Sequence, residues 1–211
     1  MALKAVTADA SSDTPEANFR DTLRESSSTP GADIVPPLLD EFWVTGPNGK
    51  HKCIVTPPAQ MGLTDGKEAS DSGLFQPRVA QSIITQLIRG ITFLHSNEII
   101  HGGNILVQFS NSIDLDSTSE VYEKFGEPKS GAVLRVDGKP LSDGVPDHIF
   151  MPGWYGVGAD KFTHGNERIL LSDFGESFNP HTTPRFSSST PLLRPPEAYL
   201  SNETLSFSSD V

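Results

Sequence analysis

The chain has 211 residues, a formal net charge of −11 and a single cysteine. This length is enough for one substantial domain and a small second one. The negative charge argues against binding to a nucleic-acid backbone. No apolar run approaches the length of a membrane span. A single cysteine excludes an internal disulfide. We therefore expect neither a nucleic-acid nor a membrane partner.

The first predicted elements are a strand and a short helix. Residues 2–6 read as a strand at the chain start, and because domains seldom open inside a strand, we expect further chain upstream. Pro15 suits the first turn of a helix. Glu16, Phe19 and Leu23 continue that helix, which ends in the Ser-rich residues 26–31.

A β-hairpin is predicted next. Its arms are residues 38–44 and 51–55, joined by the Gly-Pro-Asn-Gly turn at 46–49. Cys53 lies in an apolar run of the second arm and is expected to be a buried small hydrophobe. Thr-Pro-Pro at 56–58 ends this arm as an extended connector, because proline has no backbone N–H to donate.

The longest helix is predicted after a polar loop at residues 64–73. Pro77 suits its first turn, and His95 lies at its end. The helix is expected to be largely buried, because apolar residues recur at helical spacing and others widen that face: Val79, Ile83, Leu87, Ile91 and Leu94, with Ala80, Ile84 and Ile88.

The second half is predicted to contain few regular elements. Residues 99–107 read as two strands around a tight Gly turn, and residues 110–167 as a long, mostly irregular insert with one strand-like run at 133–136. Residues 169–171 read as a buried strand that ends in Asp173-Phe174-Gly175. A carboxylate at the end of a buried strand costs free energy unless its charge is paired, and a divalent metal is one such partner.

Each of these features also has a plain structural interpretation. Asp173 could lie in a simple turn, Lys4 on the surface, and Asn104 in a capped Gly turn. Their order, however, resembles the protein-kinase signature set. The residues that carry this resemblance are Lys4, Glu16, His101-Gly102-Gly103-Asn104, Asp173-Phe174-Gly175 and Pro195-Pro196-Glu197.

A narrower resemblance is to the serine/arginine-protein kinase-like group, especially its fungal members. It covers nearly the whole chain and rests on several segments: 38–40, 46–49, 101–102, 122–128, 135–141, 172–176 and 194–197. It implies an α+β, protein-kinase-like fold. Residues 1–56 would form a partial small β-rich lobe (strand, helix C and hairpin), and residues 57–211 an incomplete, mainly α large lobe. The large lobe would contain the insert 110–167 and the activation segment 173–197.

The resemblance also implies a site for ATP. Lys4 would contact the nucleotide phosphates, and Glu16 would pair with it, although Glu25 lies nearby in the sequence. Val55 and Thr56 would lie at the hinge beside the adenine.

The same resemblance assigns further roles in the large lobe. Asn104 and Asp173 would ligate magnesium (Mg²⁺), with ATP as the second cofactor. Glu197 would anchor the end of the activation segment, and Asp210 would brace the catalytic loop. The implied activity is transfer of the ATP γ-phosphate to Ser or Thr of a protein substrate, in particular a basic Arg/Ser-rich one, in the cytoplasm, the nucleus or both.

The chain departs from the kinase pattern in its catalytic loop. His101 and Asn104 are three positions apart instead of seven, and the segment that would carry the catalytic Asp is missing. No G-x-G-x-x-G stretch precedes Lys4, and we expect the helical base of the large lobe to be missing after Asp210. Three hypotheses follow: an active kinase, a pseudokinase that binds a nucleotide or a protein, and an incomplete version of an active kinase, which we favour. A soluble α/β interaction domain with these motifs by coincidence ranks last.

Overall fold

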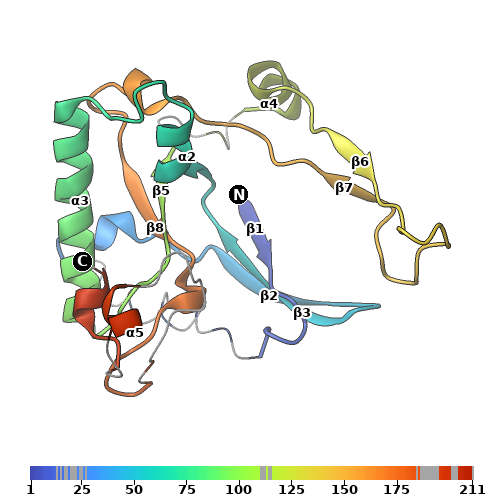
Figure 1. Ribbon diagram of the computed structural model, residues 1–211, viewed down its shortest axis with the longest axis horizontal. Helices are drawn as coiled ribbons and strands as arrows, with labels where there is room; N and C mark the ends of the chain where they lie inside the picture. The colour runs from blue at the N-terminus through green and yellow to red at the C-terminus, as the bar shows by residue number, and fades with distance from the viewer. Residues whose placement is uncertain are drawn as a thin grey trace.

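The computed structural model describes residues 1–210 apart from 13, 15, 17–18, 20–22, 24–25, 27, 110–112, 114–115, 184, 186–194 and 201–203. Its body consists of two three-stranded sheets beside one long helix, and an arm formed by the insert projects from this body (Figure 1).

The first sheet confirms the predicted strand and hairpin. It contains β1 (Ala2–Ala5), β2 (Asp40–Gly46) and β3 (Gly49–Thr56) in the antiparallel order β1-β3-β2. The sheet places Lys4 opposite Ile54. In the predicted helix, Glu16, Phe19 and Leu23 have helical backbone geometry, and Leu23 is buried, whereas Pro15 lies outside the described residues.

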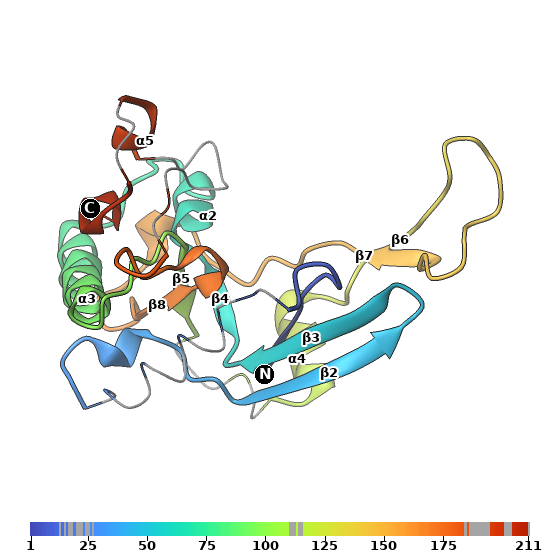
Figure 2. The same cartoon turned by 90° about the horizontal axis from the view of Figure 1, so that it is seen from below.

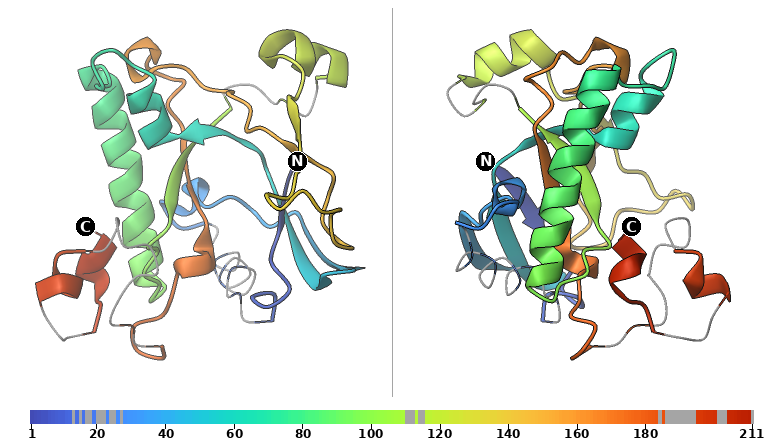
Figure 3. Two further views of the ribbon diagram at one scale, coloured as in Figure 1. Left: turned by 45° about the vertical axis from the view of Figure 1, so that its right-hand side comes forward. Right: turned by 90° about the vertical axis from the view of Figure 1, so that its left-hand side faces the viewer.

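The second sheet begins just after the two prolines of the connector. It contains β4 (Ala59–Gly62), β5 (Asn104–Gln108) and β8 (Ile169–Ser172) in the antiparallel order β4-β5-β8. The apolar run that predicted β8 is buried, since Ile169 and Leu171 are almost completely inaccessible. Figure 3 shows this sheet beside the long helix α3.

Helix α3 (Pro77–Ser96) begins where Pro77 predicted, but it is not largely buried. Its inner face holds the core residues Val79, Ile83 and Leu94, which pack with β8 and the 3₁₀ turn η1 (Ala32–Ile34). Ile84 and Ile88 are 54% and 61% exposed. The prediction was wrong for these two because the apolar band is wider than the face that the core covers.

Two predicted loops contain regular structure. Within residues 64–73, α2 (Leu63–Glu68) forms, and its N-terminus is stabilised when the main-chain N–H of Gly62 donates to the Asp65 carboxylate over 2.9 Å. In the insert, α4 (Thr118–Phe125) starts at a Ser117–Glu120 capping box. Capping signals, which periodicity alone ignores, account for both helices.

The remaining corrections concern strands. The insert carries a short antiparallel pair, β6 (Ser130–Ala132) with β7 (His148–Phe150), so the strand predicted at residues 133–136 was wrong by three positions. The first of the two strands predicted in 99–107 reduces to an isolated bridge between Ile100 and Phe178.

The arm and the C-terminal segment lie at opposite sides of the body. Figure 2 shows the β6–β7 arm extending away from α3, and its loop returns to the first sheet, where the Asn48 amide donates to the Gly144 carbonyl over 2.9 Å. The turns η3 (Ala159–Lys161) and η4 (Phe174–Glu176), the helix α5 (Glu197–Leu200) and the turn η6 (Phe207–Asp210) complete the described elements. None of the helices in the described part of the chain has the length and apolarity needed to cross a membrane.

Candidate nucleotide site

A cavity of about 290 Å³ lies where the two sheets meet. Its walls come from β1, the connector after β3, and the facing strands β5 and β8. The lining residues are Ala2, Leu3, Lys4, Glu16, Pro36, Ile54, Thr56, Pro57, Ala59, Leu106, Leu170, Ser172 and Asp173. An apolar wall with a few convergent charged groups is typical of small-molecule sites.

The charged groups in this cavity converge on one ammonium. Lys4 Nζ lies 2.8 Å from Glu16 Oε2 and 2.6 Å from Asp173 Oδ1, although 169 positions separate Lys4 from Asp173. Burial alone would lower the pKa of Lys4, but hydrogen bonds to Asp173 and Glu16 outweigh it and raise that pKa above its ordinary value. The Lys4 ammonium is therefore held in its charged form.

Asp173 adopts an unusual backbone conformation. It has φ 63° and ψ 61°, in the left-handed region that non-glycine residues rarely occupy. Such strain persists only where the surrounding structure imposes it, and it clusters at functional sites. The conformation turns the chain from β8 into η4 and leaves the carboxylate next to Lys4.

Asn104 is the first residue of β5 and is not among the residues that line the cavity. It is opposite Ser172 in the β5–β8 pair, and it shares its face of β5 with Leu106, which lines the cavity. The Asn104 amide is exposed, and the Asp173 carboxylate, one residue beyond Ser172, is half-exposed. Both carry oxygen atoms of the kind that Mg²⁺ binds, usually together with substrate phosphates. The donor chemistry of these two side chains is compatible with a magnesium ion. In the described part of the chain, no cluster of three or more His, Cys, Asp or Glu residues could hold a metal by itself.

The predicted hinge residues differ in position. Thr56 and Pro57 line the cavity, whereas Val55 is buried in the sheet and contributes nothing to the lining. The Val55 carbonyl already accepts from the main-chain N–H of Leu39 over 2.9 Å. Glu25, the alternative partner for Lys4, lies outside the described residues.

The loop between His101 and Asn104, which the resemblance matches to a shortened catalytic loop, is a tight, glycine-dependent turn. Gly102 has φ 60°, and a Cβ on Gly103 would lie 2.5 Å from the Asp173 carbonyl oxygen. Only glycine allows the turn to pass this close to β8. The two glycines place no carboxylate between His101 and Asn104.

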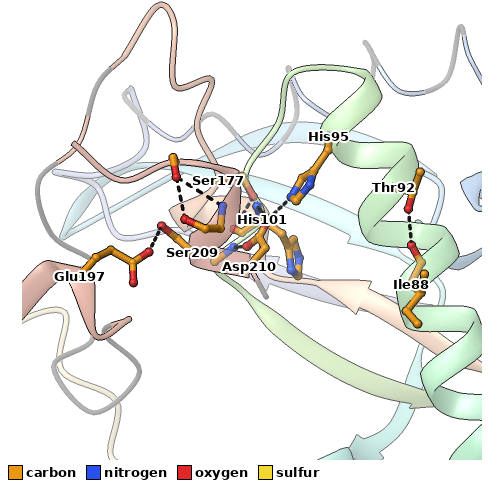
Figure 4. A network of polar contacts seen from close by, with 11 residues as sticks. Ile88, Thr92, His95, His101, Ser177, Glu197, Ser209 and Asp210 are labelled. Atoms are coloured by element: carbon orange, nitrogen blue, oxygen red, sulfur yellow. Dashed lines mark hydrogen bonds and ion pairs between the residues drawn. The ribbon is translucent and has the colours of Figure 1, made fainter. Parts of the chain in front are cut away.

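Asp210 holds this turn from the other side (Figure 4). Its Oδ2 accepts from the main-chain N–H of His101 over 2.8 Å, and its Oδ1 accepts from that of Gly102 over 2.9 Å. His95 Nε2 lies 3.0 Å from the same carboxylate, whose side chain is only 3% exposed. The brace expected of Asp210 is therefore present as hydrogen bonds.

Residues in the range 173–197, predicted as an activation segment, add two further contacts. Glu197 Oε1 accepts from the Ser209 hydroxyl over 2.9 Å, which ties α5 to the segment that carries Asp210 (Figure 4). Arg185 lies 3.3 Å from the Glu176 carboxylate. Residues 186–194, which make up most of the chain between Arg185 and Glu197, lie outside the described residues.

Comparison with known proteins finds similar structures and similar sequences, but not a family model. No protein-family model matches the chain. Over 99% of its length it superposes on 52% of a chain from a crystal structure of a kinase domain, with a TM-score of 0.59 and 19% sequence identity.

The fold is that of part of a protein kinase domain. The kinase-like chain is also 27% identical over 150 residues to a serine/threonine protein kinase of Aspergillus fumigatus strain CEA10, and to one of strain Af293 with the same figures. These matches cover 70% of this chain and 32% of each relative. The chain thus spans about a third of the length of the curated relatives that it matches.

Sequence reasoning missed several residues around this candidate site. The sequence placed His95 only at the end of a helix, yet it pairs with Asp210 across 115 positions. Ser177 donates to the His101 carbonyl over 2.8 Å, and the Phe174 ring contacts the His101 ring edge-on at 4.9 Å. No local sequence signal marks such pairs, because each joins segments far apart in the chain.

Proposed function

We propose that this chain binds ATP with Mg²⁺ in the cavity around Lys4. The observation that carries the proposal is the pairing of Lys4 with both Glu16 and Asp173 inside that cavity. An ammonium held in its charged form suits nucleotide phosphates, and the three side-chain charges sum to −1, which favours a divalent cation over a free phosphate.

Each residue of the site would have a defined task. Lys4 would bind phosphate oxygens, Glu16 would keep Lys4 directed into the cavity, and Asp173 with Asn104 would hold the metal. The metal supplies neutralisation of phosphate charge. Thr56 and Pro57 would contact the adenine, although Pro57 has no N–H to donate to it.

We further propose that the whole protein transfers the ATP γ-phosphate to Ser or Thr of protein substrates, in particular Arg/Ser-rich ones. The serine/threonine kinases that this chain resembles support the proposal, and the acidic net charge suits a basic substrate. In the transfer, a substrate hydroxyl oxygen bonds to the γ-phosphorus, the bond to ADP breaks, and the hydroxyl proton must leave.

In this chain that transfer would be slow. The turn at Gly102-Gly103 offers no carboxylate to take the hydroxyl proton, and a general base is typically worth ~10²–10⁴-fold in rate. A pseudokinase, which binds the nucleotide without transfer, is the second candidate, and the same observation favours it.

A transfer assay tests the proposal. With [γ-³²P]ATP, Mg²⁺ and an Arg/Ser peptide, we expect turnover at least ~10²-fold below the ~1–100 s⁻¹ that is usual for kinases. Any residual turnover should vanish in Asp173→Ala, whereas Asp147→Ala, which changes an exposed carboxylate on the arm, should leave it unchanged. Turnover that survives Asp173→Ala would show that the metal site is wrongly assigned.

A further inference from the structure

A second concave surface lies along the polar face of α3, lined by residues that the nucleotide site does not use. We call it the α3 groove. Its volume is about 580 Å³, and its lining residues are Arg78, Gln81, Ser82, Thr85, Gln86, Arg89 and His164. It contains no acidic lining residue, although the chain as a whole carries a net charge of −11.

The two arginines of the groove differ from the others that the structure describes. Arg135, Arg168 and Arg185 each lie within ion-pair distance of a carboxylate. Arg78 and Arg89 are exposed, and neither guanidinium has an ion-pair partner among the described residues. An unpaired guanidinium offers a planar fork of donors that matches carboxylate and phosphate oxygens.

The floor of the groove is held in place by a buried polar network. Glu167 is only 4% exposed, lies 2.9 Å from His164 Nδ1 and accepts from the main-chain N–H of Gly165. The Gln86 amide donates to the Glu167 carbonyl over 3.0 Å and accepts from the main-chain N–H of Ile169 over 3.1 Å. Because Gln86 and His164 are already fixed, a ligand has less side-chain freedom to remove on binding.

The negative charge of Glu167 does not dominate the groove. Burial opposes its ionisation, but hydrogen bonds from Ser82 and from main-chain N–H groups outweigh this, and the pKa of Glu167 lies below its ordinary value. The resulting carboxylate is covered, and its partner His164 is 66% exposed. The surface presented to a ligand is therefore that of Arg78, Arg89 and His164.

The spacing of the arginines indicates the shape of the ligand. They are eleven positions apart on one helix, which corresponds to about 16 Å at ~1.5 Å per residue. This is the separation of the two backbone positions along the helix axis, and two acidic groups at a similar separation would let each arginine pair without bending toward the other. An extended peptide advances ~3.3 Å per residue, so acidic groups roughly five residues apart would meet both arginines.

We propose that the α3 groove docks an extended acidic segment of a partner protein, with acidic groups at both ends of about a six-residue stretch. Charge complementarity selects this occupant, because a basic groove attracts an acidic peptide. Two whole copies of the chain, each with a net charge of −11, repel one another. The groove uses none of the residues that line the nucleotide cavity, so docking and ATP binding can be tested separately.

The test is fluorescence anisotropy with two labelled peptides of the same composition, EEGSGEE and GSGEEEE, added to the full chain at low salt. We expect EEGSGEE to bind at least ~3-fold more tightly, because only its acidic pairs span both arginines. Its affinity should fall ~3- to 5-fold in Arg78→Gln or Arg89→Gln, at least ~10-fold in the double variant, and steeply as salt is added.

The matched control is Arg135→Gln, which removes an exposed arginine on the arm and should leave binding unchanged. Circular dichroism and unchanged Mg²⁺–ATP binding would show that the double variant is folded. The proposal is overturned if the double variant binds EEGSGEE as the unmodified chain does, or if the two peptides bind equally. It is also overturned if anionic vesicles or RNA, but not the peptide, bind in an arginine-dependent manner.

Discussion

Asp210 should be one of the most costly residues to replace in this chain. Asp210→Ala removes the acceptors of two main-chain N–H groups, of His101 and Gly102, and the partner of His95. An unsatisfied buried donor costs about 1–3 kcal/mol, and the Gly102 N–H costs less because water can reach it. We expect a loss of about 2–4 kcal/mol in the free energy of unfolding.

Urea denaturation followed by circular dichroism measures this loss. For a chain of this size, a loss of about 2–4 kcal/mol corresponds to a fall in the unfolding temperature of about 4–16 °C. Asp210→Asn keeps one acceptor oxygen and should lose about half as much. The slope of the free energy against urea should stay the same, because the surface exposed on unfolding does not change.

Asp147→Ala is the control, since its carboxylate is 86% exposed and pairs only with exposed His148. It should change the free energy of unfolding by less than about 0.5 kcal/mol. If Asp210→Ala costs no more than this control, the carboxylate does not hold the turn at His101 and Gly102, and the account of that turn is wrong.

Three further predictions concern single residues. Gly103→Ala should destabilise the chain by about 1–3 kcal/mol, because the new Cβ would meet the Asp173 carbonyl oxygen, whereas Gly131→Ala, with open space around it, should not. Glu167→Gln should destabilise the chain above pH ~4.3, which is the pKa of Glu in the unfolded chain. The loss in the free energy of unfolding should disappear as the pH falls through the lower pKa of Glu167 in the folded chain. An equal loss at pH 3 and pH 7 in denaturation experiments would contradict this. Lys4→Met should remove a stabilising contribution that is fully present below pH ~10.4 and fades as the pH rises through the higher pKa of Lys4 in the folded chain. The variant should therefore unfold at a lower temperature than the unmodified chain, by the same amount at pH 7 and at pH 9.

The sequence predicted those parts of the fold that local signals encode. The Gly-Pro-Asn-Gly turn predicted the β2–β3 hairpin, and the apolar run at 169–171 predicted β8. The exposure of Ile84 and Ile88 could not be predicted, because periodicity shows that a face is apolar and not which part of it the core covers.

The charged groups of the candidate site were predictable for a different reason. Lys4, Glu16 and Asp173 stand in a recognisable order, and the structure brings the three together. The burial of Val55 followed from its place in the middle of a sheet, which a sequence motif does not specify. The α3 groove had no sequence signal, because its residues look like ordinary polar residues of a helix surface until the structure places His164 beside α3.

The central claim is that Lys4, Glu16 and Asp173 form a site for ATP with Mg²⁺. Isothermal titration of ATP into the folded chain, with and without Mg²⁺, measures it most directly. The account predicts binding that requires Mg²⁺ and weakens at least ~10-fold in Lys4→Met, while unfolding of the variant stays cooperative. An intact chain that binds no ATP, or a Lys4→Met variant that binds it equally well, would contradict the account.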